Sequence, residues 1–331
     1  MPAFDPARDI PSLAGRVILV TGSNAGIGKA TVRALARHKP ARIYLCGRRH
    51  DVAEQTATEL RAETHFDDIV VLDLDLGSLE NVKKAAAVVL ARETRLDLLF
   101  LNACIAGTAP ALTLEGYEAQ FGVNHVGHAM LTQLLMPLLL RTQAQAQAQD
   151  QAQGDVRIIV TSSEIIFTML LPRGGLVLDA MRKPDAFSTM SLYAHSKLAN
   201  ALFAQKLAAL YPALSVTAVN PGAVNSNIWD NSAAGLTGVI MRLVTLPIRV
   251  SIDEGAKTPL WCATTPRASQ PVTDGAKPTG VVSGAFYWPV GKLVPYKGAS
   301  AEQEQVEELW KWTTDELAKH GGPGWVGAKE E

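Results

Sequence analysis

The sequence has few cysteines, little net charge and no long apolar run, and each of these shortages argues against a class of site, ligand or segment. The three cysteines, Cys46, Cys104 and Cys262, are widely spaced, with neither a paired nor a metal-ligand pattern. We therefore expect no metal site and a reducing compartment. The 31 basic side chains nearly balance the 32 acidic ones, for a net charge of -1. That balance gives no electrostatic reason to expect binding to nucleic acid or to an anionic membrane.

Long apolar segments are also missing. No run reaches the roughly 18 apolar residues of a membrane-spanning helix, so no transmembrane segment is expected. The segment 1–15 carries Asp5, Arg8 and Asp9 and lacks the apolar centre of a signal peptide. Together these features predict a cytoplasmic protein.

Short apolar runs alternate with segments of helical spacing along most of the chain. Apolar residues make up 47% of the sequence, enough for the core of one large domain. The alternation predicts a doubly wound, Rossmann-type α/β fold with a mostly parallel sheet, as a single domain over 1–331 with its core at 16–290. Strands are predicted at 16–20, 42–46, 69–73, 96–101, 156–160, 215–219 and 285–290, and helices at 29–39, 78–93, 191–210 and 301–320, with two more helical segments within 111–141.

Three segments depart from this alternation. Residues 143–154 are nearly all glutamine and alanine. They either extend the preceding helix or form a frayed or disordered surface insertion, and we expect the insertion because there is no apolar face to bury. Residues 227–250 are apolar but broken by glycine and proline, which predicts a lid over a lipophilic pocket, with attachment to a membrane or partner as the weaker alternative. Residues 291–331 form a C-terminal helical extension.

A glycine-rich turn follows the first apolar run. Its spacing is Gly-x-x-x-Gly-x-Gly, and helical spacing begins directly after it. Such a turn lets the backbone approach a phosphate, and the helix that follows supplies N–H donors and the positive end of its dipole. A tight connection would also use glycines, but the position after the first strand favours dinucleotide binding. The predicted cofactor-binding residues here are Gly22, Ser23, Asn24, Gly26, Ile27 and Gly28.

The end of the second predicted strand indicates which dinucleotide is bound. In dinucleotide-binding folds a position about 20 residues past the glycines contacts the adenosine ribose, and an acidic residue there accepts the 2′-hydroxyl of NAD. This chain has Gly47, Arg48 and Arg49 instead. A guanidinium can bind a 2′-phosphate, so we predict NADP(H) in preference to NAD(H). Solvated loop arginines are the alternative, with more weight for Arg49.

A candidate acid–base pair lies in the segment 191–200. Tyr193 and Lys197 are four residues apart, so on a helix they share one face. A free tyrosine has a pKa near 10, and a neighbouring ammonium favours the phenolate. Alone, this spacing also fits a half-buried tyrosine and a solvated lysine. Thr161, Ser162 and Ser163 end the fifth predicted strand, at the sheet edge where ligands bind in such folds.

The order of these motifs resembles the short-chain dehydrogenase/reductase family, from about Arg16 to Val290. The string Tyr193–Asn200 resembles its retinol-dehydrogenase-like and fungal reductase branches, which use NADP(H). The motifs that carry the resemblance are Thr21–Gly28, Asp75-Leu76, Asn102-Ala103, Asn124, Ser163, Tyr193-x-x-x-Lys197 and Pro221-Gly222.

The resemblance implies four catalytic roles. Tyr193 gives its proton to the carbonyl oxygen in reduction and is the base in the reverse direction. Lys197 lowers the tyrosine pKa and hydrogen-bonds the nicotinamide ribose. Ser163, chosen over Ser162, donates a hydrogen bond to the substrate oxygen. Asn124 holds a water that relays protons to Lys197.

The resemblance also implies further cofactor contacts. Asp75 and Leu76 are expected at the adenine, and Asn102 with Ala103 along the cofactor cleft. The loop after the sixth predicted strand is expected to contact the cofactor through Pro221, Gly222, Val224 and Ser226, of which Ser226 stands where the family often has a threonine at the nicotinamide carboxamide or pyrophosphate.

One departure from the family pattern concerns the cleft. Cys104 stands where the family's Asn-Ala-Gly has glycine, so its side chain either crowds the cofactor or is accommodated by a backbone shift. His125 and His128 have no partner at metal-ligand spacing, and we expect packing or surface roles for both.

The predicted function is NAD(P)H-dependent interconversion of a carbonyl and an alcohol on a lipophilic small molecule, such as a polyketide, steroid, retinoid or terpenoid. We expect a ketoreductase of secondary metabolism, working as a homodimer or homotetramer unless the C-terminal extension covers the usual surfaces. An epimerase or dehydratase on the same scaffold is disfavoured by the spacing of Gly22, Gly26 and Gly28. A non-catalytic NADP(H)-binding redox sensor is the alternative of another class, and the presence of both Tyr193 and Lys197 argues against it.

Overall fold

The computed structural model describes residues 4–148, 155–172, 174–224, 250–268 and 280–328. At its centre is an eight-stranded sheet of order β3-β2-β1-β4-β5-β6-β7-β8. All neighbouring strands are parallel except β7 and β8, which are antiparallel. The strands are β1 Val17–Val20, β2 Arg42–Gly47, β3 Ile69–Asp73, β4 Leu98–Leu101, β5 Arg157–Thr161, β6 Ser215–Val219, β7 Phe286–Tyr287 and β8 Leu293–Val294.

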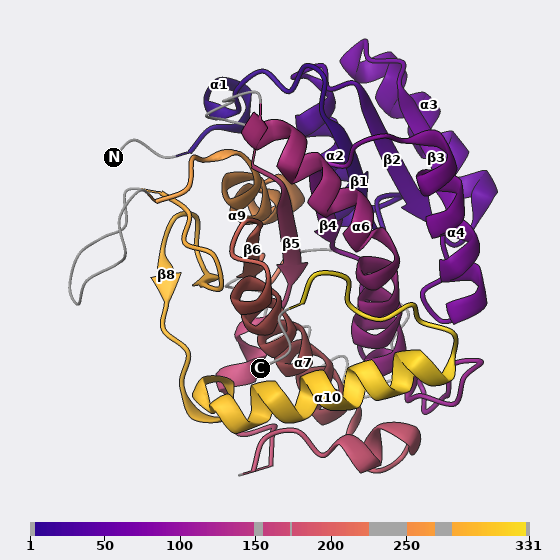
Figure 1. Ribbon diagram of the computed structural model, residues 1–331, viewed down its shortest axis with the longest axis vertical. Helices are drawn as coiled ribbons and strands as arrows, with labels where there is room; N and C mark the ends of the chain where they lie inside the picture. The colour runs from indigo at the N-terminus through magenta and orange to yellow at the C-terminus, as the bar shows by residue number, and fades with distance from the viewer. Residues whose placement is uncertain (1–3, 149–154, 173, 225–249, 269–279, 329–331) are drawn as a thin grey trace.

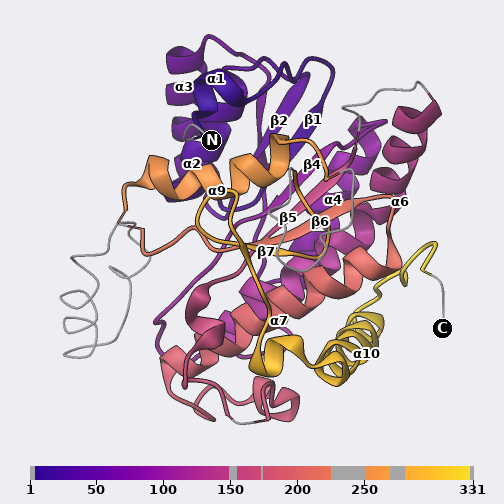
Figure 2. The same ribbon diagram turned by 90° about the vertical axis from the view of Figure 1, so that its left-hand side faces the viewer.

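Helices cover both faces of this sheet (Figures 1 and 2). One face buries side chains of α2, α3 and α9, and the other buries side chains of α4, α6, α7 and α10. The doubly wound, mostly parallel α/β fold predicted from the sequence is therefore confirmed. The helices are α1 Pro6–Asp9, α2 Gly26–Ala36, α3 His50–Thr64, α4 Leu79–Arg92, α5 Ala119–Phe121, α6 Gly127–Ala148, α7 Thr189–Leu210, α9 Ile252–Thr264 and α10 Gln303–Lys319, with a π-helical turn at Gly122–Val126.

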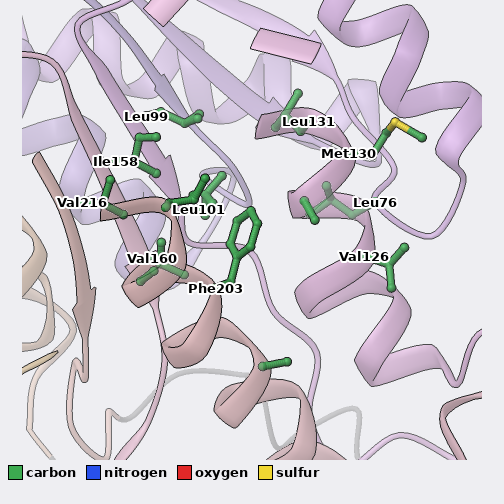
Figure 3. Close-up of a cluster of buried hydrophobic side chains, with 14 of the residues drawn as sticks. Leu76, Leu99, Leu101, Val126, Met130, Leu131, Ile158, Val160, Phe203 and Val216 are labelled. Carbon is green, nitrogen blue, oxygen red and sulfur yellow. The ribbon is translucent and has the colours of Figure 1, made fainter. Parts of the chain in front are cut away.

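The central strands are buried on both faces, which is why they read as continuous apolar runs in the sequence. All four residues of β1 and of β4 are buried. Alternate side chains of β4 and β5, such as Leu99 and Ile158, lie on the same side of the sheet, and Phe203 of α7 belongs to the same buried cluster (Figure 3). This packing holds the strands in place, so that their carboxyl ends form a stable edge of the sheet.

The strand order reverses direction between β1 and β4. The chain runs outward from β1 through β2 to β3 and then crosses back to β4 on the other side of β1. A crevice outside the carboxyl ends of the strands is expected at such a switch point, and ligands bind there in open α/β sheets. The loops after β1 and β4 are therefore brought together at one place.

Besides the four-residue α1, the described helices α3 and α9 have no counterpart among the predictions. The buried face of α3 is mostly alanine and threonine, which gives a weak apolar period. Helix α9 contains Gly255 and Pro259, two residues that usually interrupt a helix. In both cases tertiary packing against the sheet stabilises a helix that the local sequence marks poorly.

The predicted pair of helices within 111–141 is wrong in its first member. Residues 111–118 form no helix, and Leu112 instead pairs with Glu118 in an isolated antiparallel bridge. The Glu118 side chain then caps the start of α5 by accepting from the N–H groups of Gln120 and Phe121. From Ala119 the helix continues through the π-helical turn into α6.

The glutamine-rich segment also differs from expectation over its first part. Residues 143–148 continue α6, and Gln143 and Ala146 are buried. The Gln143 side chain accepts a hydrogen bond of 2.8 Å from the Val156 N–H. A polar side chain with a backbone partner thus replaces the missing apolar face, so the prediction of a frayed insertion is wrong for these six residues. Residues 149–154, and 225–249 with most of the predicted lid, lie outside the described part of the chain.

The C-terminal extension packs back onto the core. Helix α10 crosses α7 (Figure 1) and buries Val306, Leu309 and Leu317. Its Trp310 stacks on Phe203 of α7 with ring centroids 6.1 Å apart. Among the described residues, no helix is long and apolar enough to cross a membrane.

Candidate active site

The glycine turn after β1 is shaped by close backbone approach. Gly22 has φ +63°, and a Cβ there would lie 2.7 Å from the Ala103 Cα. A Cβ on Gly28 would lie 2.4 Å from the Gly22 carbonyl oxygen. No side chain caps the start of α2 at Ala25, so its first N–H groups are left for a ligand. A backbone cradle with free donors fits the pyrophosphate of a dinucleotide.

Thr21 joins this turn to the loop after β4. Its hydroxyl oxygen accepts from the N–H groups of Asn102 and Ala103, both at 2.9 Å. The Asn102 amide donates to the Thr21 carbonyl oxygen at 2.9 Å. The predicted cleft residues Asn102 and Ala103 therefore lie directly beside the glycine turn.

The other predicted cofactor residues lie at the same carboxyl edge. Arg48 directly follows β2 and is exposed, whereas Arg49 is the N-cap residue of α3. Asp75 follows β3, and its carboxylate accepts from the Gly77 N–H of its own turn. Leu76 is 6% exposed and its side chain lies in the core (Figure 3), so only its backbone faces the edge.

The loop after β6 closes the same edge. Gly222 has φ +86°, and its N–H donates to the Asn220 side chain at 3.0 Å. Val224 is buried and forms a bridge with Val250. Ser226 lies outside the described residues.

Tyr193 and Lys197 are one turn apart in α7. The helix begins at Thr189 because Ser188 caps it, accepting from the Ser191 N–H. Lys197 is fully buried. Its ammonium nitrogen lies 5.6 Å from the centre of the Tyr193 ring and donates to the Thr161 carbonyl oxygen at 3.1 Å. The lysine is therefore not the solvated side chain of the alternative interpretation.

Of the two serines after β5, the structure brings Ser163 to the tyrosine. Ser163 hydrogen-bonds the Tyr193 phenol, and its oxygen also accepts from the Ile165 N–H at 3.3 Å. Ser162 is buried and donates instead to the Lys197 carbonyl oxygen at 2.7 Å. Ser163 thus faces the acid–base group, and Ser162 ties β5 to α7.

The electrostatics of the pair differ from expectation. Burial raises the pKa of Tyr193, the negative charge of a Cys104 thiolate raises it further, and the hydrogen bond with Ser163 lowers it. Burial also lowers the pKa of Lys197, because a desolvated ammonium is costly. Among the protein's own groups, the lysine does not lower the tyrosine pKa as expected. The phenol therefore keeps its proton at neutral pH.

Asn124 lies in the π-helical turn, and both the oxygen and the NH₂ group of its side chain form hydrogen bonds. Its oxygen accepts from the Ile105 N–H at 2.8 Å, and its NH₂ group donates to the Ile105 carbonyl and to the Ser196 hydroxyl, both at 2.9 Å. Its own carbonyl oxygen lies 2.9 Å from Nδ1 of His128. The side-chain oxygen has accepted one of the two hydrogen bonds that it can accept, and the relay role stays a prediction.

Cys104 takes part in the site rather than only crowding it. The residues before it are fixed by Thr21 and the residue after it by Asn124. Its thiol is half-buried and hydrogen-bonds the Lys197 ammonium. The sequence indicated an extra side chain here but not its contact with the lysine.

The two histidines of the π-helical region are both buried. His125 packs between the rings of Phe121 and Phe203, as the predicted packing role requires. His128 instead lies 2.9 Å from the Thr21 hydroxyl through Nε2, a contact that sequence reasoning missed. The available signal was its spacing, four residues after Asn124, which places it on the same helix face. Within the described residues no cluster of side chains is arranged to hold a metal.

Known proteins are similar to this chain in sequence over most of its length. The family model for short chain dehydrogenases matches residues 16–170. A short-chain dehydrogenase/reductase of Armillaria gallica is 33% identical over 92% of this chain and 91% of its own length. Retinol dehydrogenase 12 of Mus musculus is 36% identical over 75% of this chain and 73% of its own length.

Solved structures share the fold. An uncharacterized protein from Mycobacterium Paratuberculosis has a TM-score of 0.66 at 26% identity, covering 95% of this chain and 97% of that one. The RhlG/NADP active-site complex of Pseudomonas aeruginosa has a TM-score of 0.58 at 23% identity, covering 77% and 91%, and at that identity the likeness concerns the fold alone. Because the fungal relative matches over nearly the whole of both chains, the protein belongs to the short-chain dehydrogenase/reductase family, on its retinol-dehydrogenase-like side, and is an oxidoreductase.

Proposed function

We propose that this oxidoreductase interconverts a carbonyl and an alcohol on a lipophilic small molecule with NADP(H), using Tyr193 as general acid and base. The observation that carries the proposal is the contact of the Tyr193 phenol with Ser163, above a buried Lys197. A phenol and a hydroxyl that already share a hydrogen bond form a binding place for one substrate oxygen. The glycine cradle lies at the same sheet edge.

In the reduction direction the protein supplies the proton and holds the oxygen. The nicotinamide, when bound, supplies the hydride. Ser163 donates a hydrogen bond to the oxygen as negative charge develops there, and Tyr193 delivers the proton. Because burial raises the pKa of Tyr193, the phenol carries its proton at neutral pH, and binding of the carbonyl and the nicotinamide must bring that pKa closer to the working pH for the proton to be delivered.

The choice of NADP(H) over NAD(H) rests on Arg48. It is exposed directly after β2, where a dinucleotide-binding fold places the adenosine ribose, and it is the residue type that binds a 2′-phosphate through paired donors. The Pseudomonas aeruginosa structure of the same fold is an NADP complex. Comparison of NADPH and NADH dissociation constants, in the wild type and in Arg48→Ala, tests this preference.

The lipophilic substrate class is supported by a cavity next to the serine turn. It has a volume of about 540 Å³, within the usual range for small-molecule sites. One wall is the 3-10 turn Glu164–Phe167 that Ser163 caps, and Phe286 and Trp288 of the β7 region form another. The Phe167 and Phe286 rings meet edge to face at 5.6 Å. This lining suits a polyketide, steroid, retinoid or terpenoid carbonyl, as for a ketoreductase of secondary metabolism.

The cellular compartment and the oligomeric state are inferred from observations outside the site. We infer a reducing, cytoplasmic setting from the three free cysteines. Helix α10 covers part of α7, which reduces the surface left for a homodimer or homotetramer through that helix. Size-exclusion chromatography with light scattering distinguishes these states.

The test of the function is NADPH consumption against a panel of lipophilic ketones and aldehydes. We compare the wild type with Ser163→Ala and with Ser162→Ala as the matched control. Turnover that falls about a hundredfold in the first variant and only a few-fold in the second supports the assignment. Tight NADPH binding without turnover of any carbonyl would instead favour the redox-sensor alternative.

A further inference from the structure

His128 lies between the glycine turn and the π-helical turn and contacts both. Its side chain is 2% exposed. Nε2 lies 2.9 Å from the Thr21 hydroxyl oxygen, and Nδ1 lies 2.9 Å from the Asn124 carbonyl oxygen. One buried ring therefore bridges the cofactor cradle and the helix turn beside the acid–base group.

The two contacts fix the tautomer of the ring. A backbone carbonyl can only accept, so Nδ1 carries the proton and donates to Asn124. Burial lowers the pKa of His128 to about 4, so the ring is neutral near pH 7 and Nε2 accepts from the Thr21 hydroxyl. Thr21 meanwhile accepts from the N–H groups of Asn102 and Ala103. The Thr21 hydroxyl proton also has the Phe100 carbonyl oxygen as an acceptor at 3.2 Å, so the contact with Nε2 at 2.9 Å is the shorter of the two.

The bridge continues from Asn124 to the tyrosine. The Asn124 amide donates to the Ser196 hydroxyl at 2.9 Å, and Ser196 donates to the Tyr193 carbonyl oxygen at 2.8 Å. A continuous hydrogen-bonded path thus runs from Thr21 of the glycine turn to Tyr193 of α7. It passes through the π-helical turn, in which the Gly127 N–H bonds the Gly122 carbonyl, a local geometry frequent at functional sites.

We propose that His128 is a positioning residue with two separable tasks. Through Nε2 it holds the Thr21 hydroxyl, and with it the cofactor cradle. Through Nδ1 it holds the Asn124 carbonyl, and with it the path to Tyr193. The second task rests on the proposed function of Tyr193, whereas the first requires only that the cradle binds the dinucleotide.

His125 supplies a matched control. It is three residues earlier and equally buried, and its Nε2 lies 2.9 Å from the Thr313 hydroxyl of α10. Its contacts lead to the C-terminal helix and to the rings of Phe121 and Phe203, and none of them reaches the cradle. A substitution there removes a buried imidazole of the same size without touching the bridge.

The experiment replaces the two ring nitrogens one at a time. An asparagine amide can occupy the place of Nδ1 and a glutamine amide that of Nε2. His128→Asn therefore keeps the donor to Asn124 and loses the contact with Thr21, and we expect a rise of about tenfold in the NADPH dissociation constant with kcat within about threefold. His128→Gln keeps the contact with Thr21, and we expect kcat to fall about tenfold with NADPH affinity within about threefold.

The control and a double variant complete the test. His125→Asn should lower the melting temperature as much as the His128 variants do, with kcat and NADPH affinity within about threefold of wild type. In a Thr21→Val background, His128→Asn should no longer weaken NADPH binding, because the partner of Nε2 is already gone.

Equal losses of affinity and kcat in both His128 variants, matched by His125→Asn, would overturn the proposal in favour of a purely structural role. An undiminished effect of His128→Asn in the Thr21→Val background would overturn it as well. NADPH binding is measured by cofactor fluorescence without substrate. A wild type that turns over no carbonyl while the affinity difference persists would therefore contradict the proposed function and leave the cradle half of the inference supported.

Discussion

The cofactor side and the substrate side of the site are built from different parts of the chain. On the cofactor side, backbone atoms form the surface, with Gly22 and Gly28 in contact with neighbouring backbone and Thr21 holding two N–H groups. On the substrate side, side chains form it. Phe167 and Phe286 meet edge to face, and the Lys297 ammonium lies 5.2 Å from the centre of the Phe167 ring.

Because of this difference, the two sides should tolerate amino-acid substitutions unequally. Added atoms on the cofactor side collide with backbone, which cannot move without disturbing the sheet. Rings and long side chains on the substrate side can be exchanged or repacked at smaller cost. We therefore expect substitution to change the substrate range more readily than cofactor binding.

The largest expected effect is at the backbone cradle. In Gly28→Ala the new Cβ would lie 2.4 Å from the Gly22 carbonyl oxygen and 2.7 Å from Nδ2 of Asn102. Overpacking of this kind costs about 1–3 kcal/mol, so we expect NADPH affinity to fall up to about a hundredfold in titrations by fluorescence. Gly174→Ala, where a Cβ has no neighbour within 4 Å, is the control. Equal affinity in the two variants would contradict a cradle closed to side chains.

The pH dependence of stability tests whether His125 stays neutral in the folded protein. Burial lowers the pKa of His125 to about 3, against about 6.5 in the unfolded chain. Between these values the unfolded state binds the extra proton, so stability falls as the pH falls below about 6.5. From pH 7 to 5 the wild type should lose about 2 kcal/mol more unfolding free energy than His125→Asn. Parallel losses in urea titrations would show that His125 does not remain neutral when folded.

On the substrate side, Phe167→Ala should act on substrate and not on cofactor. Removing the ring opens the wall beside Ser163 and its contact with Phe286. We expect KM for bulky lipophilic carbonyls to rise about tenfold, the effect of one buried aromatic contact, with NADPH affinity unchanged. Leu114→Ala, at a side chain 84% exposed, should change neither quantity. A loss of NADPH affinity in Phe167→Ala would contradict the separation of the two sides.

The smallest effect is expected where the two sides meet. Cys104→Gly removes the sulfur that hydrogen-bonds Lys197 and whose thiolate form raises the Tyr193 pKa. We expect NADPH to bind about threefold more tightly and the alkaline limb of the kcat profile for reduction to move to lower pH, since the phenol loses its proton more easily. Cys104→Ser keeps a hydrogen-bonding group but cannot carry the negative charge, so its NADPH affinity should match wild type while its alkaline limb moves as in Cys104→Gly. An unchanged profile in Cys104→Gly would show that the thiol does not act on the tyrosine.

The sequence was most informative where local pattern decides structure. The apolar runs predicted β1 to β6 within two residues at each end, because parallel strands are buried on both faces. Helix α10 was also predicted within two residues, since its apolar positions recur at helical spacing. Helices α3 and α9 were missed because alanine, glycine and proline at their buried positions carry little apolar signal.

The candidate site also has features that the local sequence predicted and features that it did not. The motifs placed Ser163 after the fifth strand and Tyr193 with Lys197 on one helix, and the fold then brought these two elements together. The contacts of Cys104 with Lys197 and of His128 with Thr21 join residues far apart in the chain, and no local pattern encodes such pairs. The same applies to the tyrosine pKa, because burial and not the nearby lysine dominates it.

The most direct test of the central claim is kcat for NADPH-dependent carbonyl reduction in Tyr193→Phe, measured at saturating NADPH beside the NADPH dissociation constant. If Tyr193 delivers the proton, kcat falls by a factor of about 100 to 10,000 while the dissociation constant stays within about threefold of wild type. A variant that keeps wild-type kcat would show that another group supplies the proton and would contradict the account.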